Sequence, residues 1–153
     1  MTWTVLFAAP AAVGFAVLFN VRRRALLPIA ALAVIAKSVA VLLVGEDMSV
    51  VFASFVAALL VGVVAYTLGP ATGEAAPVYG FASVVPLIPG IYVFQALQAL
   101  ESVVIARSGG VQALNPLIDA ATNGITAAGI LLALAIGVTS PVLLLPGTRT
   151  PED

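Results

Sequence analysis

The chain of 153 residues contains no cysteine and no histidine, and it carries few charged side chains. Without cysteine and histidine it cannot form disulfides, the common zinc sites, a catalytic triad or a thiol nucleophile. Lysine and arginine number 6, aspartate and glutamate number 7, and charged residues make up 8% of the chain. A soluble domain carries about 25% charged residues, so this chain cannot cover a water-facing surface. The sparse positive charge also excludes nucleic acid as a partner.

Long apolar runs dominate the sequence, with 62% hydrophobic residues and a mean hydropathy of +1.19. In the lipid core only helices and closed barrels satisfy every backbone hydrogen bond. Barrel strands alternate apolar and polar residues, whereas these runs are continuous and rich in alanine, leucine and valine. The sequence therefore predicts an all-α integral membrane protein that resides in the lipid bilayer.

Five apolar runs approach or exceed the length of about 20 residues that a membrane-spanning helix needs. They are Trp3–Phe19, Ala25–Val44, Met48–Leu68, Val78–Ser102 and Pro116–Leu145. Polar turns at 20–24 and 45–47 and loops at 69–77 and 107–115 are expected to separate them. Residues 1–145 are expected to form one transmembrane domain of five helices, followed by a short polar cytoplasmic tail at 146–153. Basic residues cluster on cytoplasmic loops, and Arg22, Arg23 and Arg24 follow the first run. This pattern predicts a multi-pass protein with its N-terminus outside and its C-terminus in the cytoplasm.

The fourth run is interrupted by Pro86, Pro89 and Gly90, which predict a broken helix. The two prolines remove two backbone donors, and glycine adopts conformations that other residues resist. In many transporters such half-helix ends bind substrate or ions near the middle of the membrane. Pro89 suits the first position of the second half-helix, whose free N–H groups would attract a carboxylate. A kink that only shapes helix packing is the alternative.

One face of the fifth run is polar in its first half and small in its second half. With helical spacing, the polar residues are Asp119, Thr122, Asn123 and Thr126, and the small ones are Gly129, Ala133 and Gly137. Small residues favour a helix–helix seam, whereas the polar residues could equally line a substrate pathway. Thr126 lies about 15 Å below the outer end of its helix. This depth matches the middle of a ~30 Å lipid core, so we expect the stripe to face the break.

Three ionisable residues lie toward the outer leaflet in this arrangement: Lys37, Glu101 and Asp119. An ion pair between Lys37 and either carboxylate would form an external gate or a proton-linked site. Alternatively, Lys37 extends its ammonium group toward the headgroups and Glu101 reaches the interface near Arg107. Gln95, on the half-helix after the break, is expected to line the same path.

Three motifs, in order along the chain, resemble those of the threonine/serine exporter (ThrE-type) family. They are the opening helix and basic turn from Ala12 to Leu26, the proline motif Val85–Gly90, and, in the last helix, Thr122-Asn123, Thr126-Ala127, Ala135–Gly137 and Pro141. The resemblance extends over nearly the whole chain. It implies a secondary-active, proton-coupled exporter of threonine, serine or related small carboxylates in the plasma membrane (inner membrane) of a prokaryote.

The chain's length resembles that of the short family members, which supply the C-terminal half as a separate small subunit. The implied partner is a larger membrane subunit of the N-terminal-half type, giving a hetero-oligomer, and a homo-oligomer is the other arrangement. The resemblance implies a transporter. An intramembrane enzyme without histidine and cysteine would need an aspartate pair or a Ser–Lys dyad, and the adjacent Lys37 and Ser38 point in different directions on a helix. No enzyme activity, catalytic residue, metal or cofactor is therefore expected. The alternative function is a structural or assembly subunit that packs against a larger transporter subunit without contacting substrate.

The expected site follows from the polar groups. Pro86, Pro89 and Gly90 would create the break, Gln95 would line the path, and Thr122, Asn123 and Thr126 would bind the amino or hydroxyl group of the substrate. Lys37, Glu101 and Asp119 would handle charge.

Overall fold

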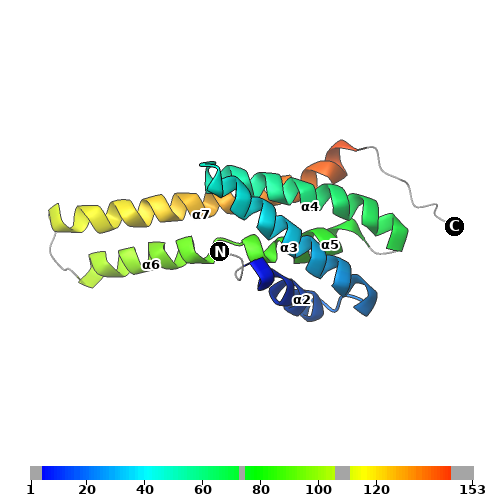
Figure 1. The fold of residues 1–153 in the computed structure, drawn as a ribbon. Coiled ribbons are helices and arrows are strands. Elements are labelled where there is room, and N and C mark those ends of the chain that lie inside the picture. The colour runs from blue at the N-terminus through cyan, green and yellow to red at the C-terminus, as the bar shows by residue number, and fades with distance from the viewer. Residues whose placement is uncertain (1–4, 73–74, 106–110, 146–153) are drawn as a thin grey trace. The chain divides into compact units, whose positions relative to one another are not determined.

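The structure, a computed structural model, describes residues 5–72, 75–105 and 111–145, and its regular elements there are all helical. The helices are α2 (Ala8–Leu18), α3 (Arg23–Gly45), α4 (Val50–Thr72), α5 (Ala76–Val84), the 3₁₀ helix η1 (Val85–Leu87), α6 (Gly90–Ile105) and α7 (Val111–Leu144) (Figure 1). The predicted all-α fold class is confirmed. The chain divides into two compact units, Met1–Leu87 with Ala133–Asp153, and Ile88–Leu132.

Helix α3 organises the first unit, because it contacts α2, α4, α5 and η1. The core around it is built mainly from alanine: Ala8, Ala12, Ala16, Ala25, Ile29, Ala33, Ala65, Tyr79 and Ala82 are all buried. In α2 the buried alanines recur at every fourth position, which places them on one face of the helix. Side chains this small let helix backbones approach closely, which is how helices associate in lipid.

Two short polar turns connect the first three helices, and each contains a residue in the left-handed conformation. Asn20 has a φ of 55° and Asp47 a φ of 60°. After α2 the N–H of Val21 donates to the carbonyl of Ala16 at 2.9 Å, which is the long bond of a Schellman cap. Asparagine and aspartate tolerate this conformation better than other non-glycine residues. The polar turns predicted after the first two apolar runs are therefore confirmed.

Three described helices are long and apolar enough to cross a membrane, namely Arg23–Gly45, Val50–Gly69 and Ala113–Leu144. A fourth span is formed if Ala76–Leu87 and Gly90–Ile105 count as one broken helix. The predicted break in the fourth run is thus confirmed. Helix α2 has 11 residues, or about 16 Å at 1.5 Å per residue, which is shorter than the lipid core. The predicted first span begins at Trp3, outside the described residues, so a fifth span stays a prediction.

Two predicted loops are partly helical. Helix α4 continues through Gly69 and Pro70 to Thr72, and α7 already begins at Val111, before Pro116. The loops predicted at 69–77 and 107–115 are therefore shorter than expected. A proline removes one bond to the carbonyl four residues earlier, and in both places the helix continues across that single loss. The predicted polar tail at 146–153 and Arg107 lie outside the described residues.

The second unit contains α6 and the N-terminal part of α7. No side chain of α6 is buried. Its large apolar side chains, including Ile91, Phe94 and Leu97, are exposed. In a bilayer such a surface contacts lipid tails or another protein.

Candidate functional site

The broken helix is a short 3₁₀ turn followed by two non-helical residues. Helix α5 gives way to η1 at Val85, and α6 begins at Gly90. The N–H of Gly90 donates to the carbonyl of Ile88 at 2.9 Å, across a tight turn. The carbonyl of Pro89 accepts from Tyr92 and Val93, at 3.1 and 3.2 Å. Pro89 therefore stands just before α6 and not at its first position as the sequence suggested, within the usual uncertainty of helix ends.

The break leaves the carbonyl of Pro86 without a helical donor. In a helix this oxygen would accept from the N–H of residue 90, or of residue 89 in a 3₁₀ turn. Pro89 has no N–H, and Gly90 donates to Ile88. A side chain from another helix takes this place, since the ammonium group of Lys37 donates to the Pro86 carbonyl at 3.4 Å. The exposed main-chain group that the prolines predicted is therefore paired with α3.

The Lys37–Pro86 contact lies near the middle of the predicted membrane. Pro86 is ten residues beyond Ala76, where α5 begins, which places it about 15 Å along that helix. Lys37 is fourteen residues beyond Arg23, or about 21 Å. Helical side chains lean toward the N-terminus of their helix, so the ammonium group returns toward the level of Pro86. Lys37, which is half-buried, thus reaches inward rather than toward the nearer end of α3.

A buried hydroxyl makes a second polar contact between α3 and α5. Ser83 is fully buried, and its hydroxyl donates to the carbonyl of Ile29 at 3.4 Å. Ser83 lies three residues, or about one turn, before Pro86. Its bond to Ile29 therefore holds the end of α5 against α3, the helix that also carries Lys37. The sequence analysis did not single out Ser83. Its signal is a polar residue three positions before a proline in an apolar run.

Two side chains of the polar stripe on α7 donate to carbonyls of their own helix. Asn123 donates its side-chain amide to the carbonyl of Asp119 at 2.9 Å, and Thr126 donates its hydroxyl to the carbonyl of Thr122 at 2.8 Å. Asp119 and Thr122 are exposed, and Asn123 and Thr126 are half-buried. Such bonds remove the cost of an unpaired donor in lipid. They leave the hydroxyl and amide oxygens as acceptors for a ligand.

The remaining predicted residues lie on α6. Gln95 and Glu101 are both exposed. They and the α7 stripe belong to the second unit, whereas Lys37 and Pro86 belong to the first. The structure therefore brings together Lys37 and Pro86. The ion pair of Lys37 with Glu101 or Asp119, and the site shared by the break and the stripe, stay predictions.

The small residues at the end of α7 form a helix–helix seam. A Cβ built on Gly137 would lie 2.9 Å from the carbonyl oxygen of Phe55 and 2.8 Å from the Cβ of Ala58. On α4, a Cβ at Gly62 would lie 2.6 Å from the carbonyl oxygen of Val138. The seam predicted for Gly137 is therefore confirmed, with α4 as its partner. Gly62 escaped the sequence analysis, although its signal is visible: small residues four apart occur at 58 and 62 and again at 133 and 137.

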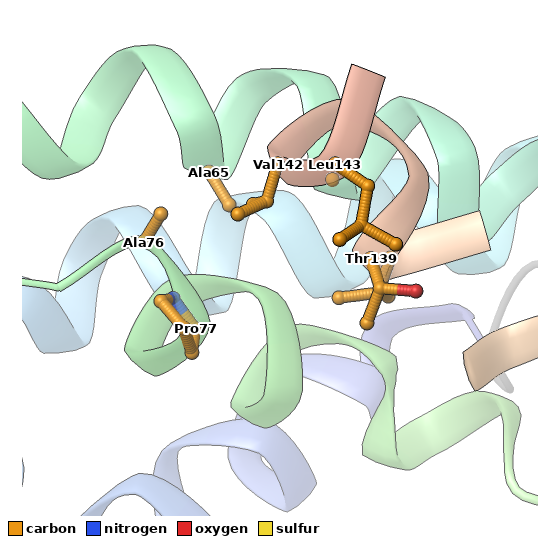
Figure 2. Close-up of a pocket in the computed structure, with 8 residues that line it drawn as sticks. Ala65, Ala76, Pro77, Thr139, Val142 and Leu143 are labelled. Carbon is orange, nitrogen blue, oxygen red and sulfur yellow. The ribbon is translucent and has the colours of Figure 1, made fainter. Parts of the chain in front are cut away.

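An apolar cavity of about 300 Å³ lies beside this seam. Its lining is Gly62, Ala65, Ala76, Pro77, Val138, Thr139, Val142 and Leu143 (Figure 2). The hydroxyl of Thr139 donates to the carbonyl of Ala135 at 2.7 Å, within its own helix. Since the other lining side chains are apolar, the cavity suits a hydrocarbon chain and offers little to a polar solute.

The family comparison agrees with this helical membrane architecture. A family model described as threonine/serine exporter, ThrE, matches residues 4–144 of the 153-residue chain. No solved structure matches the chain. The family is one of transporters, so the chain is not placed among enzymes. Because the family model covers almost the entire sequence, this multi-pass membrane protein belongs to the threonine/serine exporter family.

Proposed function

We propose that this chain is the small subunit of a secondary-active, proton-coupled exporter of threonine, serine or related small carboxylates. The observation that carries the proposal is the family match over residues 4–144. We also propose that the chain works with a larger membrane subunit of the same family. Its orientation would follow the basic residues Arg22–Arg24, with the N-terminus outside and the C-terminus in the cytoplasm.

The exposed polar residues of the second unit support a partner subunit. Asp119 is exposed and lies eight residues beyond Val111, the start of α7, which is about 12 Å along the helix. A charged residue at the centre of a membrane helix costs about 2.5–3.5 kcal/mol. A partner surface or an aqueous path that covers Asp119 would avoid such a cost.

The polar stripe supports a role in the substrate path. The bonds from Asn123 and Thr126 use one donor of each side chain and leave both side-chain oxygens as acceptors. A substrate's amino or hydroxyl group is a donor and would complement them. In the alternative function, a structural or assembly subunit, the same face would bind the larger subunit instead.

Export measurements test the proposal. Proteoliposomes would be loaded with labelled threonine, serine or a small dicarboxylate, with this chain present alone or with the larger subunit. We expect export with both subunits, accelerated by an inward proton gradient and abolished by a protonophore. Absence of export for every substrate in both settings would overturn the proposed function.

A pair of substitutions separates the pathway from the scaffold. Asn123→Leu with Thr126→Val replaces two of the four polar residues of the stripe. Thr139→Val is the matched control, because its hydroxyl also bonds to its own helix. Normal assembly with lost export supports the pathway, and lost assembly supports the scaffold. Unchanged export and assembly would contradict both roles for the stripe.

A further inference from the structure

The contact between Lys37 and Pro86 joins a cation and a carbonyl that has no helical donor, at the middle of the predicted membrane. We propose that these two groups bind the zwitterionic head group of an α-amino acid. The substrate's carboxylate would accept from the ammonium group of Lys37, and its own ammonium group would donate to the carbonyl of Pro86. This inference rests on the proposed function, since it assumes that the transported solute is an amino acid.

Lys37 has donors to spare for a carboxylate. A lysine ammonium group carries three donors, and its bond to Pro86 uses one of them at the long distance of 3.4 Å. A carboxylate also brings a negative charge, and its attraction to the ammonium group at low dielectric exceeds what the neutral carbonyl of Pro86 supplies. A carboxylate would therefore displace the carbonyl of Pro86 from Lys37. Lys37 is half-buried, so part of its side chain remains accessible.

Pro86 then requires a new donor, which the amino acid itself supplies. With Lys37 turned to the carboxylate, the Pro86 carbonyl would be unpaired, because Pro89 has no N–H and Gly90 donates to Ile88. An unpaired polar group in lipid is costly. The ammonium group of the substrate removes this cost. The resting contact thus holds both binding groups in place before the substrate arrives.

Charge and hydrogen bonding together select the zwitterion over simpler relatives. A zwitterion has no net charge, so its entry adds none to the membrane interior, where charge is expensive. A substrate without a carboxylate would place a second cation beside Lys37. A substrate without an amino group would leave Pro86 unpaired. Threoninamide is an analogue without the carboxylate, and 2-hydroxybutyrate is an analogue without the amino group.

The lysine of the site can be followed directly, because Lys37 is the single lysine in the sequence. The purified complex with its larger subunit, in lipid nanodiscs, would be treated with a small membrane-permeant amine reagent and analysed by mass spectrometry. We expect threonine to slow the labelling of Lys37 but not that of the N-terminal amine. Threoninamide and 2-hydroxybutyrate should protect Lys37 much less. Equal protection by either analogue, or none by any α-amino acid, would overturn the proposal.

Equilibrium binding of labelled amino acids to the same complex provides the second measurement. Lys37→Met should weaken binding by at least about tenfold, the ratio for one lost charged hydrogen bond. Lys37→Arg should retain most of the affinity. Arg24→Met is the control, because Arg24 is an exposed cation at the start of the same helix. Unchanged affinity in Lys37→Met would overturn the site and leave the export function standing.

Measuring the binding of several different α-amino acids separates the proposed site at Lys37 and Pro86 from the proposed threonine and serine substrates. If threonine and serine fail to bind but another α-amino acid binds in a Lys37-dependent manner, the site is supported and the proposed substrate is wrong. Circular dichroism and gel filtration would verify that Lys37→Met is folded. If Lys37→Met does not fold, the protection of Lys37 from labelling by threonine in the wild-type complex tests the proposed site instead.

Discussion

Replacing Gly62 by alanine should loosen the seam between α4 and the C-terminal part of α7. The added Cβ would lie 2.6 Å from the carbonyl oxygen of Val138 and 3.0 Å from that of Gly137. Both obstacles are backbone atoms, which cannot rotate away as the end of a side chain can. The two helices must therefore move apart along this seam.

The size of the effect follows from that movement. Ordinary contact begins at 3.4 Å, so the required local shift from 2.6 Å is about 0.8 Å. A gap of this size forfeits about a quarter to a half of the dispersion energy of the atoms that face each other. Overpacking of this kind costs about 1–3 kcal/mol. The better helix propensity of alanine returns about 0.5–1 kcal/mol, which leaves a net loss of about 0–2.5 kcal/mol. Relative to a glycine-to-alanine change in open space, the loss is the full value of about 1–3 kcal/mol.

Unfolding in SDS, followed by circular dichroism of the protein in mixed micelles, measures this loss. Gly14→Ala in α2 is the matched control, because nothing lies within 4 Å of a Cβ there, and it should be neutral or slightly stabilising. Gly137→Ala should resemble Gly62→Ala. Since either change separates the same two helices, the double variant should cost less than the sum. If Gly62→Ala unfolds at the same SDS fraction as Gly14→Ala, the close approach of these helices is refuted.

Two further substitutions probe the polar contacts of the first unit. Tyr79→Phe removes a hydrogen bond of 2.9 Å to the hydroxyl of Thr72, which should cost about 0.5–1.5 kcal/mol in the free energy of unfolding. A double-mutant cycle with Thr72→Val checks this, and strictly additive costs would contradict the contact. Pro89→Ala restores an N–H three residues after Pro86, so Lys37→Met should destabilise the Pro89→Ala background less than the wild type. Equal destabilisation in both backgrounds would show that Lys37 does not satisfy that carbonyl.

The helical class and the break could be predicted because they depend on local chemistry. Continuous apolar runs leave the helix as the structure that satisfies its own backbone in lipid, and Pro86 and Pro89 remove donors wherever they stand. The helix ends near Pro70 and Pro116 were harder to predict. A proline removes a single bond of the helix, and neighbouring bonds can carry the helix across it, so its presence does not decide where the helix stops.

The contacts between helices were the least predictable part of the candidate site. Lys37 was expected to seek a carboxylate or the headgroups, and its partner in the structure is a backbone carbonyl 49 residues away. Every residue has a backbone carbonyl, so the identity of Pro86 does not mark its own carbonyl as available. The signal is Pro89, whose missing N–H leaves the carbonyl of Pro86 without a donor. Gly62 also has a sequence signal. Small residues four positions apart at 58 and 62 match those at 133 and 137, and this match predicts that Gly62 faces Gly137.

The pairing of Lys37 with Pro86 also bears on how the protein enters the bilayer during synthesis. A ribosome makes α3 before α5 and η1, because α3 precedes them in the chain. The ammonium group is thus already in place when the proline-containing segment leaves the translocation machinery. The broken segment around Pro86 would insert poorly alone, because its carbonyl has no helical donor. Lys37 supplies that donor, so insertion of this segment depends on α3 being in the membrane first.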